Sequence, residues 1–203
     1  MSSKSVGILL FLAGFIILMG IITGEVFYPL GYHTSVNEIS DLGATRPPNS
    51  VIYQPSAMIF NATMLISGFL ILAAGIFLQK YHQNWLFSVV FALFGLGILG
   101  VGIFPGNVAP YHGLFALLTF VMGSLSCIFS RLILKGPFSV VGIPIGVFSL
   151  VFLFGANLFI PILGSGGTER WVAYPIVIWL IGFGGYWLGN AEENYPLLQA
   201  KIE

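Results

Sequence analysis

The chain has 203 residues, of which 57% are hydrophobic and only 7% are charged, and its mean hydropathy is +0.98. A soluble domain carries about a quarter charged residues, so this composition excludes a water-soluble protein and predicts an integral membrane protein. Seven basic residues balance seven acidic ones, and we therefore expect no nucleic-acid partner. The single cysteine, Cys127, cannot form an intramolecular disulfide, and its apolar surroundings predict a packing role.

Apolar runs along the chain predict an all-α fold, a bundle of six transmembrane helices in a single domain over 1–203. Each run is long enough to cross a hydrocarbon core of roughly 30 Å. The first run exceeds the apolar centre of a signal peptide, which has about 7–15 residues, so we expect a retained helix. The predicted helices lie at about 6–28, 56–78, 85–104, 112–134, 138–160 and 170–189, and a polar cytoplasmic tail follows at 190–203.

Glycines recur at regular spacing inside two of these spans. The stretch Gly95-x-Gly97-x-x-Gly100 has the letters of a dinucleotide fingerprint, but it lies within a membrane span and no strand precedes it. Gly142 and Gly146 have the spacing of a helix-contact motif. We expect both sets to permit close helix packing, and we predict no cofactor. No metal-ligand spacing such as His-x-x-x-His occurs either, so we predict no metal site.

Basic residues predict the orientation of the bundle in a cell membrane. Six spans place both termini on one side, and the side that carries more Lys and Arg is expected to be cytoplasmic. With cytoplasmic termini, the segments 29–55, 105–111 and 161–169 share the outer face. The inner set is then Lys4, Lys80, Arg131, Lys135 and Lys201, and the outer set is Arg46 and Arg170.

A polar segment, Tyr32 to Arg46, separates the first two predicted spans and holds the only aspartate of the chain, Asp41. Ser35 and Glu38 have capping-box spacing, which predicts a short interfacial helix over 36–42. Helical periodicity gives this helix one apolar and one polar face. We expect Val36, Ile39 and Leu42 to face the membrane and Asn37, Ser40 and Asp41 to face the protein.

Several side chains of the predicted outer face could have either a structural or a functional role. Asp41 either caps the short helix or pairs with Arg46 or Arg170, or it acts as a ligand or general base. Ser40 is expected to bond to backbone rather than to act as a nucleophile. His112 is either a satisfied interfacial residue or part of a site.

Charges at the helix ends offer similar choices. Glu25 either reaches the interface or pairs with a polar loop. Glu169 follows a natural N-cap, Thr168, and is expected to interact with the helix dipole. Arg170 begins the last predicted span beside a carboxylate, which favours a bidentate clamp for a phosphate or carboxylate.

Three short motifs resemble signatures of a known family. They are Asn37-Glu38-Ile39-Ser40-Asp41-Leu42-Gly43, Gly102-Ile103-Phe104-Pro105 followed by His112, and Gly167-Thr168-Glu169-Arg170. In this order they resemble a family of small six-helix prokaryotic membrane proteins known only as domain of unknown function number 998. The resemblance covers almost the whole chain. It implies the fold and a single site formed by the three motifs, and it implies no activity.

Two classes of function remain open from the sequence. In the first, the outer polar residues bind or modify a lipid headgroup or another small anionic ligand, with Asp41 or His112 as general base. The ligand-binding residues would be Asn37, Ser40, Arg46, Glu169 and Arg170. In the second, the protein is a non-catalytic accessory or structural subunit of a larger membrane complex. Its partners would be membrane lipids and other membrane subunits or copies of itself, and whether it is an enzyme stays open.

Overall fold

The computed structural model describes residues 3–29 and 31–190, and all regular structure in these residues is helical. The α-helices are α1 (Ser3–Val26), α2 (Ser56–His82), α3 (Trp85–Ile103), α4 (Tyr111–Phe129), α5 (Phe138–Phe154) and α6 (Ala156–Gly189), and two 3-10 helices are η1 (Ile39–Leu42) and η2 (Ser130–Leu132). Five α-helices are long and apolar enough to cross a membrane, and α5 is a shorter apolar helix. The predicted fold class, an all-α six-helix membrane bundle, is confirmed.

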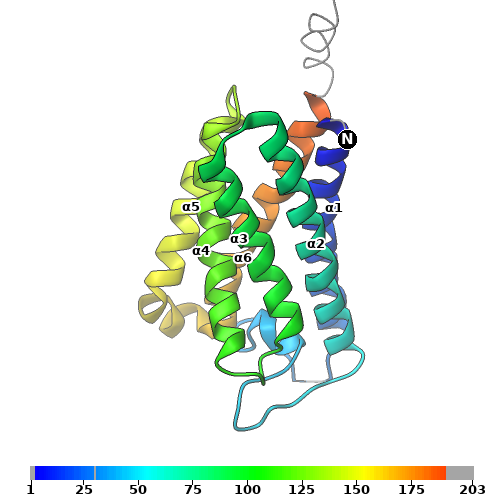
Figure 1. Ribbon diagram of the computed structural model, residues 1–203. Coiled ribbons are helices and arrows are strands. Elements are labelled where there is room, and N and C mark those ends of the chain that lie inside the picture. The colour runs from blue at the N-terminus through cyan, green and yellow to red at the C-terminus, as the bar shows by residue number, and fades with distance from the viewer. Residues whose placement is uncertain (1–2, 30, 191–203) are drawn as a thin grey trace, which may run out of the picture.

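The helices alternate in direction along the bundle (Figure 1). Each helix packs against the next one in the chain and α6 packs against α1, so the six helices form a closed ring. The start of α1 and the end of α6 lie at the same end of the bundle, and the connection between α1 and α2, with η1, lies at the opposite end, which we call the loop end. An even number of membrane crossings, such as six, places the start of α1 and the end of α6 on the same side, as observed. Cytoplasmic termini remain a prediction, and the predicted tail from 191 onward lies outside the described residues.

The glycines inside the spans lie at close helix contacts, as their spacing predicts. A Cβ atom on Gly97 would lie 2.7 Å from the backbone nitrogen of Thr119 on α4. A Cβ atom on Gly142 would lie 2.2 Å from the carbonyl oxygen of Cys127, which is itself fully buried. Since no side chain fits at these distances, only glycine lets the backbones approach so closely.

The boundary between α5 and α6 differs from the prediction. Helix α5 ends at Phe154 and α6 begins at Ala156, so the predicted loop 161–169 is helical and Pro161 lies inside α6. The chain bends instead at Gly164, whose φ of 76° and ψ of 169° are not helical. Glycine adopts such a positive φ at little cost. Figure 1 shows the gold segment before the bend crossing the loop end, so that only the later part of α6 runs along the bundle.

The predicted short helix exists, but its bounds and its orientation are corrected. It is the 3-10 helix Ile39–Leu42 rather than a helix over 36–42. Ile39 and Leu42 are buried in the core, with 5% and 0% exposure, whereas Val36 is 64% exposed. The apolar residues therefore face the bundle and not the membrane. The cap lies at Glu38, because its backbone N–H donates to the Asp41 carboxylate at 3.0 Å.

Candidate functional site

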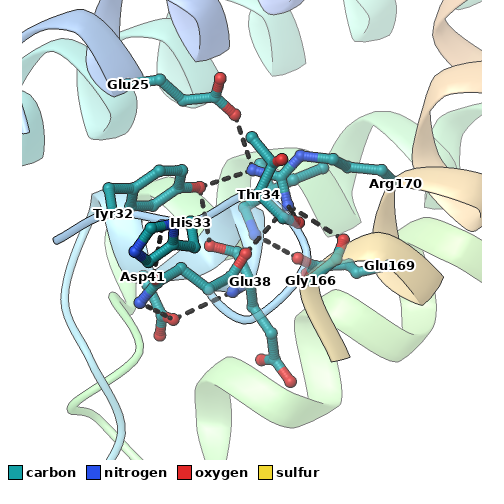
Figure 2. Close-up of polar contacts among 11 residues, drawn as sticks. Glu25, Tyr32, His33, Thr34, Glu38, Asp41, Gly166, Glu169 and Arg170 are labelled. Atoms are coloured by element: carbon teal, nitrogen blue, oxygen red, sulfur yellow. Dashed lines mark hydrogen bonds and ion pairs between the residues drawn. The ribbon is translucent and has the colours of Figure 1, made fainter. Parts of the chain in front are cut away.

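Arg170 on α6 is the centre of the polar network at the loop end (Figure 2). Its Nη1 donates to the carbonyl oxygens of Thr34, Asn37 and Gly166 at 2.8, 2.9 and 2.9 Å. Its Nη2 donates to the Glu25 carboxylate and to the Tyr32 hydroxyl, each at 2.6 Å. We call this group the Arg170 clamp. It joins α1, the first loop and α6 through one side chain, which suits the rigid fork of a guanidinium.

Tyr32 relays the clamp toward η1. Its hydroxyl accepts from Arg170 and donates to the carbonyl oxygen of Glu38 at 3.2 Å. Burial raises the pKa of the Tyr32 phenol, although the neighbouring Arg170 acts in the opposite direction. The phenol therefore stays neutral and keeps the proton that it donates to Glu38.

The first loop lies directly on α6 because α6 carries glycine where the loop backbone passes. A Cβ atom on Gly164 would lie 1.9 Å from the carbonyl oxygen of Ser35, and one on Gly166 would lie 2.0 Å from that of Asn37. The Ser165 hydroxyl donates to the carbonyl oxygen of Val36 at 2.7 Å. Backbone polar groups of the loop thus find partners on the helix, as buried groups require.

Of the alternatives for Asp41, the structure shows the cap of the short helix, and no described ion pair joins Asp41 to Arg170. Asp41 caps η1, accepting from the backbone N–H of Glu38 at 3.0 Å and lying 3.5 Å from the Asn37 amide nitrogen. Arg170 takes Glu25 as its carboxylate partner, at 2.6 Å. Glu25 is therefore paired, but with a residue of α6 and not with a polar loop as the second alternative had it. Arg46 instead pairs with Glu38 at 2.6 Å, and its side chain is 64% exposed.

Ser40, His112 and Glu169 meet at a cavity inside the helix ring. The cavity has a volume of about 70 Å³, and its other lining residues are mainly apolar side chains of α1, α2, α3, α4 and α6. Glu169 accepts a short hydrogen bond from the backbone N–H of Ile39. Each of the three sequence motifs contributes to this region, because His112 also contacts the carbonyl oxygen of Phe104 at 2.7 Å. The motifs that resemble family signatures are therefore neighbours in space.

His112 is the most deeply buried ionisable residue of this set, with 3% exposure. Since a carbonyl oxygen only accepts, the Nδ1 atom facing Phe104 carries the hydrogen in the neutral ring, and Nε2 is left as an acceptor. Nε2 is buried and has no hydrogen-bond partner within the described structure. His112 thus lines the cavity and carries a buried acceptor without a partner among the described residues.

A larger groove of about 480 Å³ lies on the other face of α6. At its polar part are Thr34, Ser35 and Arg170, whose Nε is buried and has no partner among residues 3–29 and 31–190. Trp171 and Ile178, which are 49% and 60% exposed, continue the groove along the apolar surface of the helix. The remaining lining residues are Leu163, Gly167, Tyr174 and Pro175.

Glu25, Tyr32 and the glycines of α6 are site residues that sequence reasoning missed. Glu25 could have been recognised from the sequence, because it is the one acidic residue in the first apolar run and needs a polar partner there. No feature of the sequence marks Tyr32 as a site residue apart from its place in the polar segment. Within the described ranges, no group of three or more His, Cys, Asp or Glu residues is arranged to hold a metal ion.

Comparison with known proteins places the chain in a family without assigning an activity. A family model described as a protein of unknown function matches residues 11–186. No curated protein and no solved structure matches the chain. The matched range includes the Arg170 clamp, the cavity and the groove, so all three lie within the part shared with the family.

Proposed function

The chain belongs to the DUF998 family of proteins of unknown function, and we propose that it binds the headgroup of a membrane lipid at the loop end of the bundle. The observation that carries this proposal is the groove beside Arg170, which joins polar groups to an exposed apolar helix surface. A lipid has the same division, with a hydrogen-bonding head and an apolar chain. Its chain would lie along Trp171 and Ile178, and its head would lie near Thr34, Ser35 and Arg170.

The charges around the groove favour an uncharged or zwitterionic headgroup over a simple anion. Arg170 is already paired with Glu25 at 2.6 Å and bonded to three carbonyl oxygens. Its positive charge is therefore largely compensated, and a free phosphate would have to displace these partners. The Nε–H has no described partner but is itself buried, so the exposed hydroxyls of Thr34 and Ser35 are the groups that would meet an ester, hydroxyl or phosphodiester oxygen of a lipid.

Lipid retention tests this proposal with a matched pair of variants. Ser35 lines the groove, and the next residue, Val36, is 64% exposed and does not line it. Ser35→Phe would fill the groove, whereas Val36→Phe adds the same ring outside it. Each protein is purified in mild detergent, and the lipids that remain bound are identified by native mass spectrometry.

We expect the unchanged protein and Val36→Phe to retain the same lipid class, and Ser35→Phe to lose it at least several-fold. Equal retention by all three proteins would contradict the groove as the binding site. Thermal unfolding of both variants in the same detergent shows whether the fold is intact.

A further inference from the structure

His112 lines the cavity between the helices. The residue is only 3% exposed, and its Nε2 atom is buried and has no hydrogen-bond partner in the described part of the chain. Leaving a buried acceptor unpaired is unfavourable. A bound molecule that donates a hydrogen bond to Nε2 would remove this cost, which favours a ligand with a hydrogen-bond donor.

Part of the cavity lining on α4 and α6 lies toward the surface of the bundle. Its lining includes Ala116 and Thr119 of α4 and Glu169 and Ala173 of α6, and all four are only partly buried. The deeper wall is apolar and fully or nearly fully buried, for example Phe94 with 2% exposure. This partly buried side is where a molecule from the bilayer would enter.

We propose that this cavity binds the hydroxyl-bearing end of an uncharged lipid, such as a long-chain alcohol, with the hydroxyl donating to Nε2 of His112. The volume of about 70 Å³ is about half of the ~150 Å³ cavity that accommodates benzene in an engineered protein. It therefore holds only the polar end, while the chain extends between α4 and α6 into lipid. The site lies on the opposite face of α6 from the groove, so it is independent of the proposed headgroup site.

Glu169 selects against a charged ligand. Its carboxyl group lines the cavity and accepts only the backbone N–H of Ile39 among the described hydrogen bonds, and no described ion pair includes it. A fatty-acid carboxylate in the same apolar space would lie beside another acid, and the neighbouring Arg170 is already paired with Glu25. A hydroxyl group carries no charge and offers the hydrogen that His112 lacks. The site should therefore prefer an alcohol to the acid or alkane of equal length.

Nitrogen NMR of the full-length protein in detergent micelles tests this preference directly. The chain has three histidines, and His112→Gln identifies the resonances of the buried ring. The histidine-labelled protein is titrated with 1-octanol, octanoate and octane. Octanol should shift the Nε2 resonance of His112 saturably toward that of a hydrogen-bonded nitrogen, and octanoate and octane should not. The exposed ring of His33 serves as the internal control for non-specific effects.

Occluding variants separate binding in the cavity from partitioning into the micelle. Ala173→Leu and Ala116→Leu each fill the cavity from one side, whereas Ala62→Leu adds the same atoms to an exposed position on α2. The octanol response should disappear in both cavity variants and persist in Ala62→Leu. Equal responses to octanol and octane, a response that survives both cavity variants, or no response of His112 to octanol would overturn the proposal and leave a cavity that holds water only.

Discussion

Two arginine–glutamate pairs at the loop end have the same N–O distance, 2.6 Å, but differ in burial. The side chains of Arg170 and Glu25 are 10% and 22% exposed, whereas that of Arg46 is 64% exposed. Water screens the exposed pair, and the buried pair would leave an uncompensated charge if one partner were removed. Distance alone therefore gives no measure of what each pair contributes to stability.

Glutamine at each arginine tests this difference. We expect Arg170→Gln to lower the free energy of unfolding by roughly 3–5 kcal/mol, because Glu25 stays buried without its cation. Arg46→Gln should cost about 0–1 kcal/mol, since its pair is exposed. Thermal unfolding in one detergent compares the two variants. Similar losses of stability would show that the Arg170 clamp does not hold the loop to α6.

Glu38 gives the loop end a specific dependence on pH. Burial raises the pKa of its carboxyl group above 4.5, although Arg46 opposes the shift. The folded protein then binds the proton more tightly than the unfolded chain does, so this residue's contribution to stability is largest at low pH and is lost as pH rises through the folded pKa. We expect Glu38→Gln to remove that loss, so that its melting temperature relative to the unchanged protein rises between about pH 4 and pH 7. A constant difference over this range would contradict the raised pKa.

At the scale of single residues, the sequence predicts which polar residues lie at the same end of the bundle but not which of them form hydrogen bonds or ion pairs with one another. The motifs of Asn37, His112 and Arg170 do meet, as expected for motifs on one end of a bundle. Asp41 and Glu25 were both available to Arg170, and the choice depends on the rotation of α1 and on the path of the loop. Neither follows from residue spacing. The capping role of Asp41 was among the alternatives, because a carboxylate three residues after the cap has a local backbone partner.

At the scale of the elements, the glycines of α6 differ in their surroundings, and only some of them lie against the first loop. A Cβ atom on Gly166 would lie 2.0 Å from the carbonyl oxygen of Asn37, whereas one on Gly185 meets nothing within 4 Å. Alanine normally stabilises a helix relative to glycine by up to ~1 kcal/mol. The same substitution should therefore have opposite signs at the two positions of one helix.

Gly166→Ala should lower the melting temperature, because the loop backbone must move away from α6. Gly185→Ala should leave it unchanged or raise it. Unfolding curves of both variants in one detergent provide the measurement. A neutral Gly166→Ala would mean that the loop does not pack on α6 as closely as the structure shows.

The bend of α6 shows why element boundaries were harder to predict than the elements. The predicted fifth helix ends before Pro161, because proline lacks the N–H that a helix interior uses. The chain bends at Gly164 instead, where the carbonyl oxygen of Ser35 occupies the space of a side chain. Because Ser35 lies in another segment, this contact leaves no local signal. The same reason explains η1, whose apolar residues are drawn into the core by tertiary contacts.

For the whole molecule, the class and the six helices followed from composition and apolar runs, because the bilayer imposes both. The orientation remains to be tested. Asn49 lies in the first loop and Lys80 near the opposite end of the bundle, and both are exposed. In a Cys127→Ala background, an impermeant thiol reagent added to intact cells should label Asn49→Cys and not Lys80→Cys. Labelling of position 80 alone would reverse the predicted orientation.

The central claim, a lipid at the groove beside Arg170, is tested most directly by an experimental structure of the unchanged protein in lipid nanodiscs. We expect elongated density along Trp171 and Ile178 whose polar end lies within hydrogen-bonding distance of the Thr34 or Ser35 hydroxyl. Well-ordered lipids elsewhere on the bundle together with an empty groove would contradict the claim.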